Sequence, residues 1–149
     1  MPTLATNKRA GFDYELLDRY EAGLVLSGQE VKSAKTGHIS LKGSYVTLRE
    51  GELFLINAKI PKYKFAGELK NYDSERSRKL LLKKSEIKSL IGKIKSQGLT
   101  LVPIRVYTKK RLLKLEFAIG RGKKKFDKRE SIKKSESQRK AQRALRTRD

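Results

Sequence analysis

The chain has 149 residues, a length that suits one domain and leaves little room for two. It contains no cysteine, which excludes disulfides, thiolate nucleophiles and cysteine-ligated zinc. Its 37 lysine and arginine residues against 16 acidic residues give a net charge of +21, which indicates a polyanionic partner. No apolar segment approaches the roughly 18 residues that span a bilayer, so RNA or DNA is favoured over a membrane. The N-terminus is too short and polar for a secretory signal, and we expect a soluble, cytoplasmic protein.

The first third of the chain predicts strands followed by a short helix. Residues 1–6 form a short lead that we expect to be flexible. Apolar and polar residues alternate imperfectly over residues 12–26, which favours strands broken by a turn or bulge at Ala22-Gly23. Residues 30–35 then predict a short helix that ends at Gly37.

The middle of the chain carries the clearest hairpin signal. Residues 45–49 are rich in β-branched and aromatic side chains, Glu50-Gly51 fits a tight turn, and residues 52–56 form the return strand. Residues 60–77 then predict a long, lysine-bearing loop, and loops of that length in compact domains are usually functional or disordered.

A helix and two strands are predicted next. The helix runs from Lys84 to Ser96, with Ser85 as its N-cap and Gly98 as its stop. Apolar strands follow at residues 99–107 and 112–119, joined by a basic turn. In the first strand, odd-numbered residues from 101 to 105 are expected on one face and even-numbered residues from 102 to 106 on the other.

Beyond Gly120 the composition changes. Residues 122–149 contain 12 basic and 4 acidic residues and too few apolar ones to form a core, so alone this tail is expected to be disordered. We therefore expect a flexible lead (1–6), an RNA-binding domain (7–121) and a basic tail (122–149). The domain is expected to be mainly β, a closed antiparallel barrel of the oligonucleotide-binding (OB) type with flanking α-helices, although the pattern alone does not distinguish it from other small β folds.

Three segments point to RNA. Residues 7–10 are a basic approach to the first strand, although an ordinary charged terminus would look the same. In residues 74–82, three cations precede an apolar run, and arginine forks bind phosphates and stack on bases; a solvated loop entering a core strand is the equal alternative. Residues 122–129 place Phe126 among cations, an arrangement that stacks an unpaired base while its neighbours hold phosphates.

Signals for catalysis are weak. His38 is the only histidine and has no ligand-like neighbours, so neither a metal site nor a bound cofactor is expected. Four acids between residues 13 and 21 would point in different directions on strands, which disfavours a metal-dependent nuclease. We expect a protein that is not an enzyme.

The same segments resemble the small protein B family, whose members bind transfer-messenger RNA. Residues 21–33 (EAGLVLSGQEVKS) resemble the most recognisable block of that family. Residues 7–10 (NKRA), 76–82 (RSRKLLL) and 122–129 (GKKKFDKR) also match, in the family's order and spacing. Four motifs in register are far more specific than any one of them.

The resemblance implies an OB-like barrel that binds the tRNA-like domain of transfer-messenger RNA (SsrA RNA) and has no catalytic activity. It implies delivery of this RNA to the A site of stalled ribosomes, alongside elongation factor Tu and alanyl-tRNA synthetase. The tail would become helical in the empty mRNA channel, near the ribosomal RNA of the decoding centre. We expect a monomer, with a general RNA chaperone or a structural ribosome-associated protein as the alternative.

Motif positions and residue chemistry together predict two sets of contacts. The RNA-binding set is Asn7, Lys8, Arg9, Glu21, Lys32, Arg76, Arg78, Lys79 and Leu81. The ribosome-binding set in the tail is Lys123, Lys124, Phe126, Asp127, Lys128 and Arg129. Leu81 fits a core position equally well. Lys59 and residues 72–74 depart from the family pattern, so the loop around them is expected to make different contacts.

Overall fold

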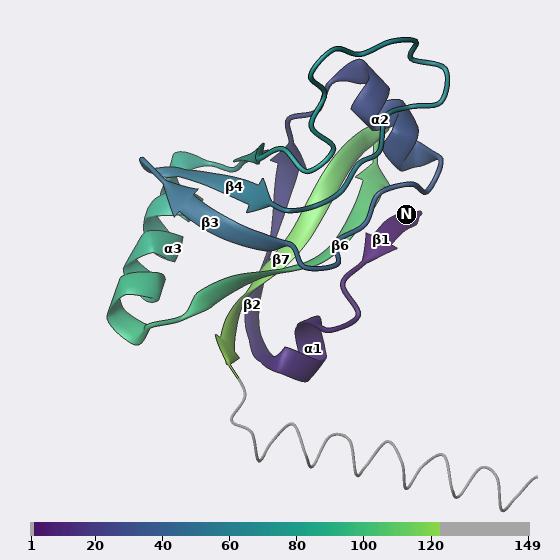
Figure 1. Ribbon diagram of the computed structural model, residues 1–149. Helices are drawn as coiled ribbons and strands as arrows, with labels where there is room; N and C mark the ends of the chain where they lie inside the picture. Colours follow the sequence, from purple (N-terminus) through teal and green to yellow (C-terminus); the bar gives the residue numbers. More distant parts are fainter. Residues whose placement is uncertain (1, 123–149) are drawn as a thin grey trace, which may run out of the picture.

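The computed structural model describes residues 2–122, and the tail from Lys123 onward lies outside the described residues. Within them the chain is mainly antiparallel β with three helices (Figure 1). The strands are β1 (Thr3–Thr6), β2 (Tyr14–Leu24), β3 (Tyr45–Arg49), β4 (Glu52–Ile56), β5 (Arg78–Leu81), β6 (Thr100–Lys109) and β7 (Leu112–Gly122). The helices are α1 (Ala10–Asp13), α2 (Gly28–Lys35) and α3 (Lys84–Gln97). None of the described helices is long and apolar enough to cross a membrane.

All seven strands belong to one sheet. Its order is β1-β6-β3-β4-β5-β2-β7, and every pairing is antiparallel. An additional pairing joins β6 to β7, so the hydrogen-bonded neighbours lead from β6 through β3, β4, β5, β2 and β7 back to β6. Only β1 lies outside this circuit, on the other edge of β6.

The core is formed by the side chains that the strands turn inward. Leu55, Leu115 and Phe117 are completely buried within it. Tyr20 of β2 stacks on Phe117, with ring centroids 5.7 Å apart. Ala34 of α2 and Leu90 of α3 belong to the same cluster, so these helices are packed on the sheet.

Local sequence chemistry explains where the elements begin and end. The hairpin of β3 and β4 has the predicted bounds, because Glu50 (φ 50°) and Gly51 (φ 77°) supply the two positive φ angles of the tightest hairpin turn. Gly98 (φ 61°) ends α3 in the left-handed conformation, as predicted. The N-cap of α3 is Lys83 and not Ser85, so that prediction was wrong.

Two expectations for the N-terminal part were also wrong. Thr3–Thr6 form a strand paired with β6 where a flexible lead was expected, because the edge of β6 supplies partners that four residues of sequence do not reveal. β2 continues without a break through Ala22-Gly23, which pair in register with Leu115 and Lys114. Its irregularity lies earlier, between Leu16 and Arg19.

The predicted alternation of faces along β6 fails at its middle. Leu101 and Val106 lie in the same core cluster although they are five residues apart. A register shift between Pro103 and Arg105 leaves Ile104 as an extra residue opposite β7, and this bulge reverses the faces beyond it. Arg105 is thereby turned outward beside Glu116.

Candidate nucleic-acid interface

Asn7 fixes the start of the first predicted RNA-binding segment. Its backbone N–H donates to the carbonyl of Ile104 (2.7 Å) and its Nδ2 donates to the carbonyl of Pro103 (2.9 Å). Its Oδ1 accepts from the backbone N–H of Arg9 (3.3 Å). Because two bonds hold Asn7 against β6 and a third fixes the turn to Arg9, the exposed side chains of Lys8 and Arg9 leave the sheet from a fixed point.

Arg9 is exposed and oriented by neighbours on α1. Its guanidinium pairs with Asp13 (3.2 Å), and its Cζ lies 4.8 Å from the centre of the Phe12 ring. Hydrogen bonding and charge from Asp13 raise the pKa of Arg9 above its ordinary value. The arginine therefore remains charged throughout the physiological range, at a set position beside the sheet.

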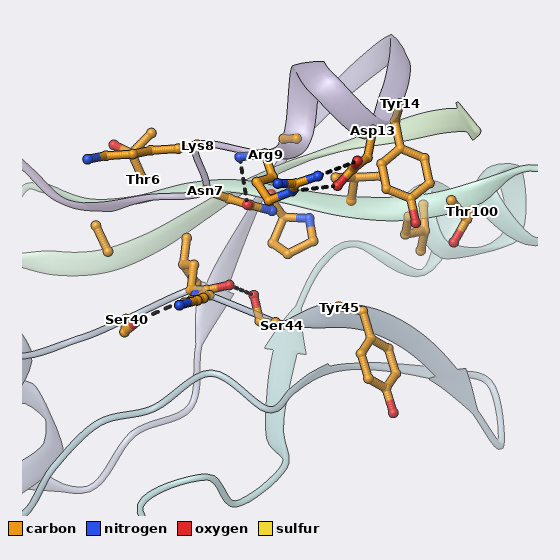
Figure 2. Close-up of a pocket in the computed structure, with 18 of the residues that line it drawn as sticks. Thr6, Asn7, Lys8, Arg9, Asp13, Tyr14, Ser40, Ser44, Tyr45 and Thr100 are labelled. Atoms are coloured by element: carbon orange, nitrogen blue, oxygen red, sulfur yellow. Dashed lines mark hydrogen bonds and ion pairs between the residues drawn. The ribbon is translucent and has the colours of Figure 1, made fainter. Parts of the chain in front are cut away.

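A hollow of about 850 Å³ lies against this segment. In Figure 2, Asn7, Lys8 and Arg9 lie on one side of it and Ser44 lies on the other, while the ring of Tyr45 points away from them. Its remaining lining residues belong to the end of β1, to α1, to Tyr14, to the segment before β3 and to the beginning of β6. Polar and cationic groups thus lie beside apolar side chains around this hollow.

Glu21 lies on an outward surface of β2, β6 and β7. We call this surface the acid–cation face; its residues are Arg19, Glu21, Arg105, Lys109, Lys114 and Glu116. Glu21 accepts a hydrogen bond from the hydroxyl of Tyr107 and lies 3.3 Å from Lys109 Nζ. Arg19 (3.0 Å) and Arg105 (3.5 Å) both pair with Glu116, which is directly opposite Glu21 in the sheet.

The charges of this face are held in defined states. The hydrogen bond from Tyr107 lowers the pKa of Glu21, and Lys109 adds to the effect against partial desolvation. Burial and the Glu21 carboxylate raise the pKa of Tyr107. Glu21 is therefore ionised at neutral pH, with 37% of its side chain exposed, and has acceptor capacity directed outward.

Leu81 belongs to the same side of the sheet. It is 53% exposed, so the alternative that places it in the core is wrong. It pairs with Gly23 in the sheet. A Cβ atom added at Gly23 would lie 3.4 Å from Leu81 Cβ and 3.8 Å from Lys114 Nζ, so these two side chains approach each other over the glycine. Lys79, two residues before it, pairs with Glu52 (3.0 Å) and is also partly exposed.

Glu30 and Arg78 form a completely buried ion pair. Arg78 Nε lies 2.9 Å from Glu30 Oε2, and both side chains have no exposed surface. The other Arg78 donors reach the backbone carbonyls of Ala58 (2.6 Å) and Ser74 (2.9 Å). Direct contact between Arg78 and RNA is therefore excluded in this conformation, and its placement in the RNA-binding set was wrong.

The carboxylate of Glu30 serves several partners at once. It accepts from Arg76, which is partly exposed, and from the backbone N–H of Ser27 (2.9 Å). Ser27 Oγ in turn accepts a bond from the Glu30 backbone N–H, which completes a capping box at the start of α2. Burial by itself would raise the pKa of Glu30, but the bonds from Arg76, Ser27 and Arg78 prevail and lower it to about 2.

The predicted RNA-binding residues thus fall into three places. Asn7, Lys8 and Arg9 lie beside the hollow, while Glu21, Lys79 and Leu81 lie on or next to the acid–cation face. Lys32 and Arg76 lie around α2, where Lys32 Nζ is 5.9 Å from the Tyr63 ring. The predicted tail contacts lie outside the described residues.

Sequence reasoning missed Glu30 and Tyr107 as organisers of these surfaces. Ser27-x-x-Glu30 is a capping-box pattern and could have located the start of α2. Nothing local marks Tyr107, because its partner Glu21 is 86 residues away in the chain. Across residues 2–122, no three His, Cys, Asp or Glu side chains are grouped as metal ligands would be.

Together the fold and these surfaces define a small, strongly basic antiparallel β protein of the nucleic-acid-binding type. A family model described as "SmpB protein" matches residues 4–147. The chain belongs to this family, which confirms the resemblance seen in its motifs.

Similar proteins cover nearly the whole chain. The SsrA-binding protein of Thermosipho africanus is 50% identical over 141 residues, which are 94% of this chain and 94% of that protein. The SsrA-binding protein of Trichormus variabilis is 47% identical over 95% of this chain and 92% of that protein. A chain in the solved structure "tmRNA-SmpB: a journey to the center of the bacterial ribosome" is 42% identical, with a TM-score of 0.66 over 85% of this chain and 92% of that chain.

Proposed function

We propose that this protein is an RNA-binding adaptor of trans-translation. It binds the tRNA-like domain of transfer-messenger RNA and accompanies that RNA into the A site of stalled ribosomes. The observation that carries this proposal is the identity of 47–50% with SsrA-binding proteins over more than nine-tenths of both chains. The protein acts as a monomer in the cytoplasm without a chemical step of its own, alongside elongation factor Tu and alanyl-tRNA synthetase.

The sheet is, in this proposal, an OB-like closed barrel. The circuit of pairings from β6 back to β6 supports closure, because each of these six strands has a hydrogen-bonded neighbour on both sides. β1 adds a short flap to this circuit and brings Asn7 to the rim. RNA-binding OB domains use such outward strand surfaces together with the neighbouring loops.

The acid–cation face is proposed as the main RNA contact. Lysines and arginines there neutralise phosphates, while Glu21 accepts hydrogen bonds from base amino groups or from a ribose 2′-hydroxyl. Leu81 offers an apolar surface to a ribose or base beside them. Tyr107 and Lys109 orient the Glu21 carboxylate, so that it accepts hydrogen bonds from RNA and its charge, offset by Lys109, does not repel the phosphates.

The segment from Asn7 to Arg9 is proposed as a second phosphate contact at the hollow. The buried pair of Glu30 and Arg78 has an indirect role. Glu30 binds Arg76 and holds it in place, and Arg76 is exposed enough to reach RNA. The tail residues Lys123–Arg129 are proposed to contact ribosomal RNA, on the strength of their charge.

The decisive test is selectivity. The purified full chain is titrated with transfer-messenger RNA, with ribosomal RNA of equal length and with bulk tRNA, across a series of salt concentrations. A preference for transfer-messenger RNA that persists as salt rises supports a shaped site. Equal binding that collapses with salt would instead establish the general RNA chaperone.

Two variants test the separate roles of the domain and the tail. Glu21→Ala is expected to weaken binding of the tRNA-like domain roughly tenfold or more, because a lost bond to a charged group costs about 1.5–3 kcal/mol. The matched control is Asp18→Ala, an exposed acid on the same strand that pairs with Lys93; equal losses in both variants would refute the role of Glu21. Deletion of residues 131–149 is expected to leave this affinity largely intact while abolishing peptide tagging on stalled ribosomes.

A further inference from the structure

The loop between β4 and β5, which lies beside Lys32 of α2, presents an exposed aromatic ring. Figure 1 shows this loop beside α2, at the end of the molecule opposite α1. Phe65 near its tip is 76% exposed, the most exposed of the large apolar side chains among residues 2–122. Most of the surface of this ring is therefore open to contact with a partner.

The ring is held by a built turn. The Ala66 N–H donates to the Tyr63 carbonyl (3.0 Å), which closes a turn with Lys64 and Phe65 at its corner. The Tyr63 ring meets the Phe65 ring edge to face, with centroids 5.6 Å apart. We call residues Tyr63–Ala66 the aromatic turn.

The aromatic turn is fastened to α2. The Tyr63 N–H donates to Gln29 Oε1 (2.9 Å), and Ser33 Oγ donates to the carbonyl of Pro61 (2.7 Å). Below them the Tyr72 hydroxyl donates to the Ile60 carbonyl (2.6 Å) and ties the loop to the buried pair of Glu30 and Arg78. The turn is thus a platform that is already in place before a partner binds, so little conformational entropy of the loop is lost on binding.

Cations surround this platform. Lys32 Nζ lies 5.9 Å from the Tyr63 ring centre and Lys64 Nζ lies 5.6 Å from that of Phe65. Between residues 59 and 72 the chain has four lysines and one acid, Glu68. An exposed ring with Lys64 over it and Lys32 at the neighbouring Tyr63 ring fits an unpaired base on the open surface of the ring and its phosphates on the ammonium groups. An apolar protein surface would explain the ring but not the concentration of positive charge.

We propose that the aromatic turn binds an unpaired nucleotide of RNA by stacking on Phe65, with Lys32 and Lys64 at the adjoining phosphates. This inference rests on the proposed function only for which RNA molecules can supply the nucleotide. Those sources are the transfer-messenger RNA itself, at nucleotides beyond the acid–cation face, and the ribosomal RNA around the bound complex. Stacking tolerates any base, so the site adds affinity and orientation and does not read a sequence.

The absence of tryptophan from the chain makes the test direct. Phe65→Trp places a single fluorophore on the platform of the full chain, and Leu69→Trp places one in the same loop outside the turn. Each variant is titrated in two arms, with a transcript of the tRNA-like domain and with ribosomes lacking mRNA. Complex formation is followed independently by gel mobility or sedimentation.

Stacking on a base quenches the emission of Phe65→Trp and shields it from iodide, while Leu69→Trp changes little. The arm in which this occurs identifies the source of the nucleotide. In that arm Phe65→Ala is expected to lower affinity about five- to 150-fold, the range for a lost base-stacking ring, while Phe65→Tyr retains binding. No quenching in either arm although complexes form would overturn the proposal.

Two other outcomes are equally decisive. A blue shift without quenching would show an apolar protein contact, and equal responses of the two tryptophan variants would show general coverage of the loop; each overturns stacking on Phe65. If the chain showed no preference for transfer-messenger RNA, the proposed function would fail. Quenching by whichever RNA it does bind would still decide the role of the aromatic turn.

Discussion

Replacing Glu30 by glutamine tests whether the buried pair holds the fold together. Glu30→Gln keeps the size of the side chain but removes the charge that faces Arg78 and Arg76. Arg78 then remains inside the protein as an uncompensated cation, with no exposed surface through which to recover hydration. The new amide also presents donors to a site where every partner of the carboxylate, including the Ser27 N–H, is itself a donor.

The expected cost is large for one substitution. Removing one partner of a buried ion pair destabilises a domain by about 3–5 kcal/mol, because the other charge is left unpaired. Domains have total stabilities of about 5–15 kcal/mol, so this change removes a substantial part. At about 4 °C per kcal/mol for a domain of this size, Tm falls by roughly 12–20 °C.

Urea and thermal unfolding of the full chain at pH 7, followed by circular dichroism, measure this loss. Glu52→Gln is the matched control, because Glu52 is 48% exposed and its pair with Lys79 lies on the surface. An exposed pair contributes about 0–1 kcal/mol, so the control is expected to lose less than that. A loss below about 1 kcal/mol for Glu30→Gln would refute the assignment of Arg78 as a buried, carboxylate-dependent cation.

The same pair predicts how stability depends on pH. The pKa of Glu30 is about 2 in the folded state against an ordinary value of 4.5, so below pH 4.5 the unfolded state binds the extra proton first. The contribution of Glu30 is therefore complete above pH 4.5 and is lost as the pH falls towards 2, by about 3 kcal/mol. Glu30→Gln lacks this component, and the difference between the two unfolding curves across that window isolates it.

Two further predictions concern the sheet. Gly120→Ala is expected to cost about 1–3 kcal/mol, because its Cβ would lie 2.7 Å from Val102 Cγ2; in urea unfolding, combination with Val102→Ala should cost less than the sum of the single changes, and strict additivity would contradict the clash. Asn7→Ala removes the bond to the Pro103 carbonyl and is expected to cost about 1 kcal/mol of stability and to weaken RNA binding, measured on the same sample. Unchanged RNA affinity would show that Asn7 does not position the basic segment after it.

The sequence predicted those elements whose signals are local. The β3–β4 hairpin was located to the residue because Glu50-Gly51 and the strands on either side define it within twelve positions. The stop of α3 at Gly98 was equally local. By contrast, the partners of β1 and of Glu21 lie about 100 and 86 residues away, and no short pattern announces them.

Charge was the least reliable guide to the site. Arg78 stands among Arg76, Lys79 and other polar residues and looks like one cation of an exposed cluster. The alternation of β5 turns it inward, and there Glu30 from a helix 48 positions earlier neutralises it. Whether a charged side chain faces solvent or a buried partner is decided by tertiary pairing, which composition does not record.

The fastening of the β4–β5 loop has a consequence for the evolution of the molecule. Its two ends are joined by the bond from the Ile60 N–H to the Ser74 carbonyl (2.9 Å), and Arg78 binds carbonyls on both sides of it. These bonds therefore close the base of the loop next to the sheet, whatever residues lie between Ile60 and Ser74. Lengthening a closed loop costs little entropy, so residues 62–71 can be exchanged or extended while the structure of the sheet stays unchanged.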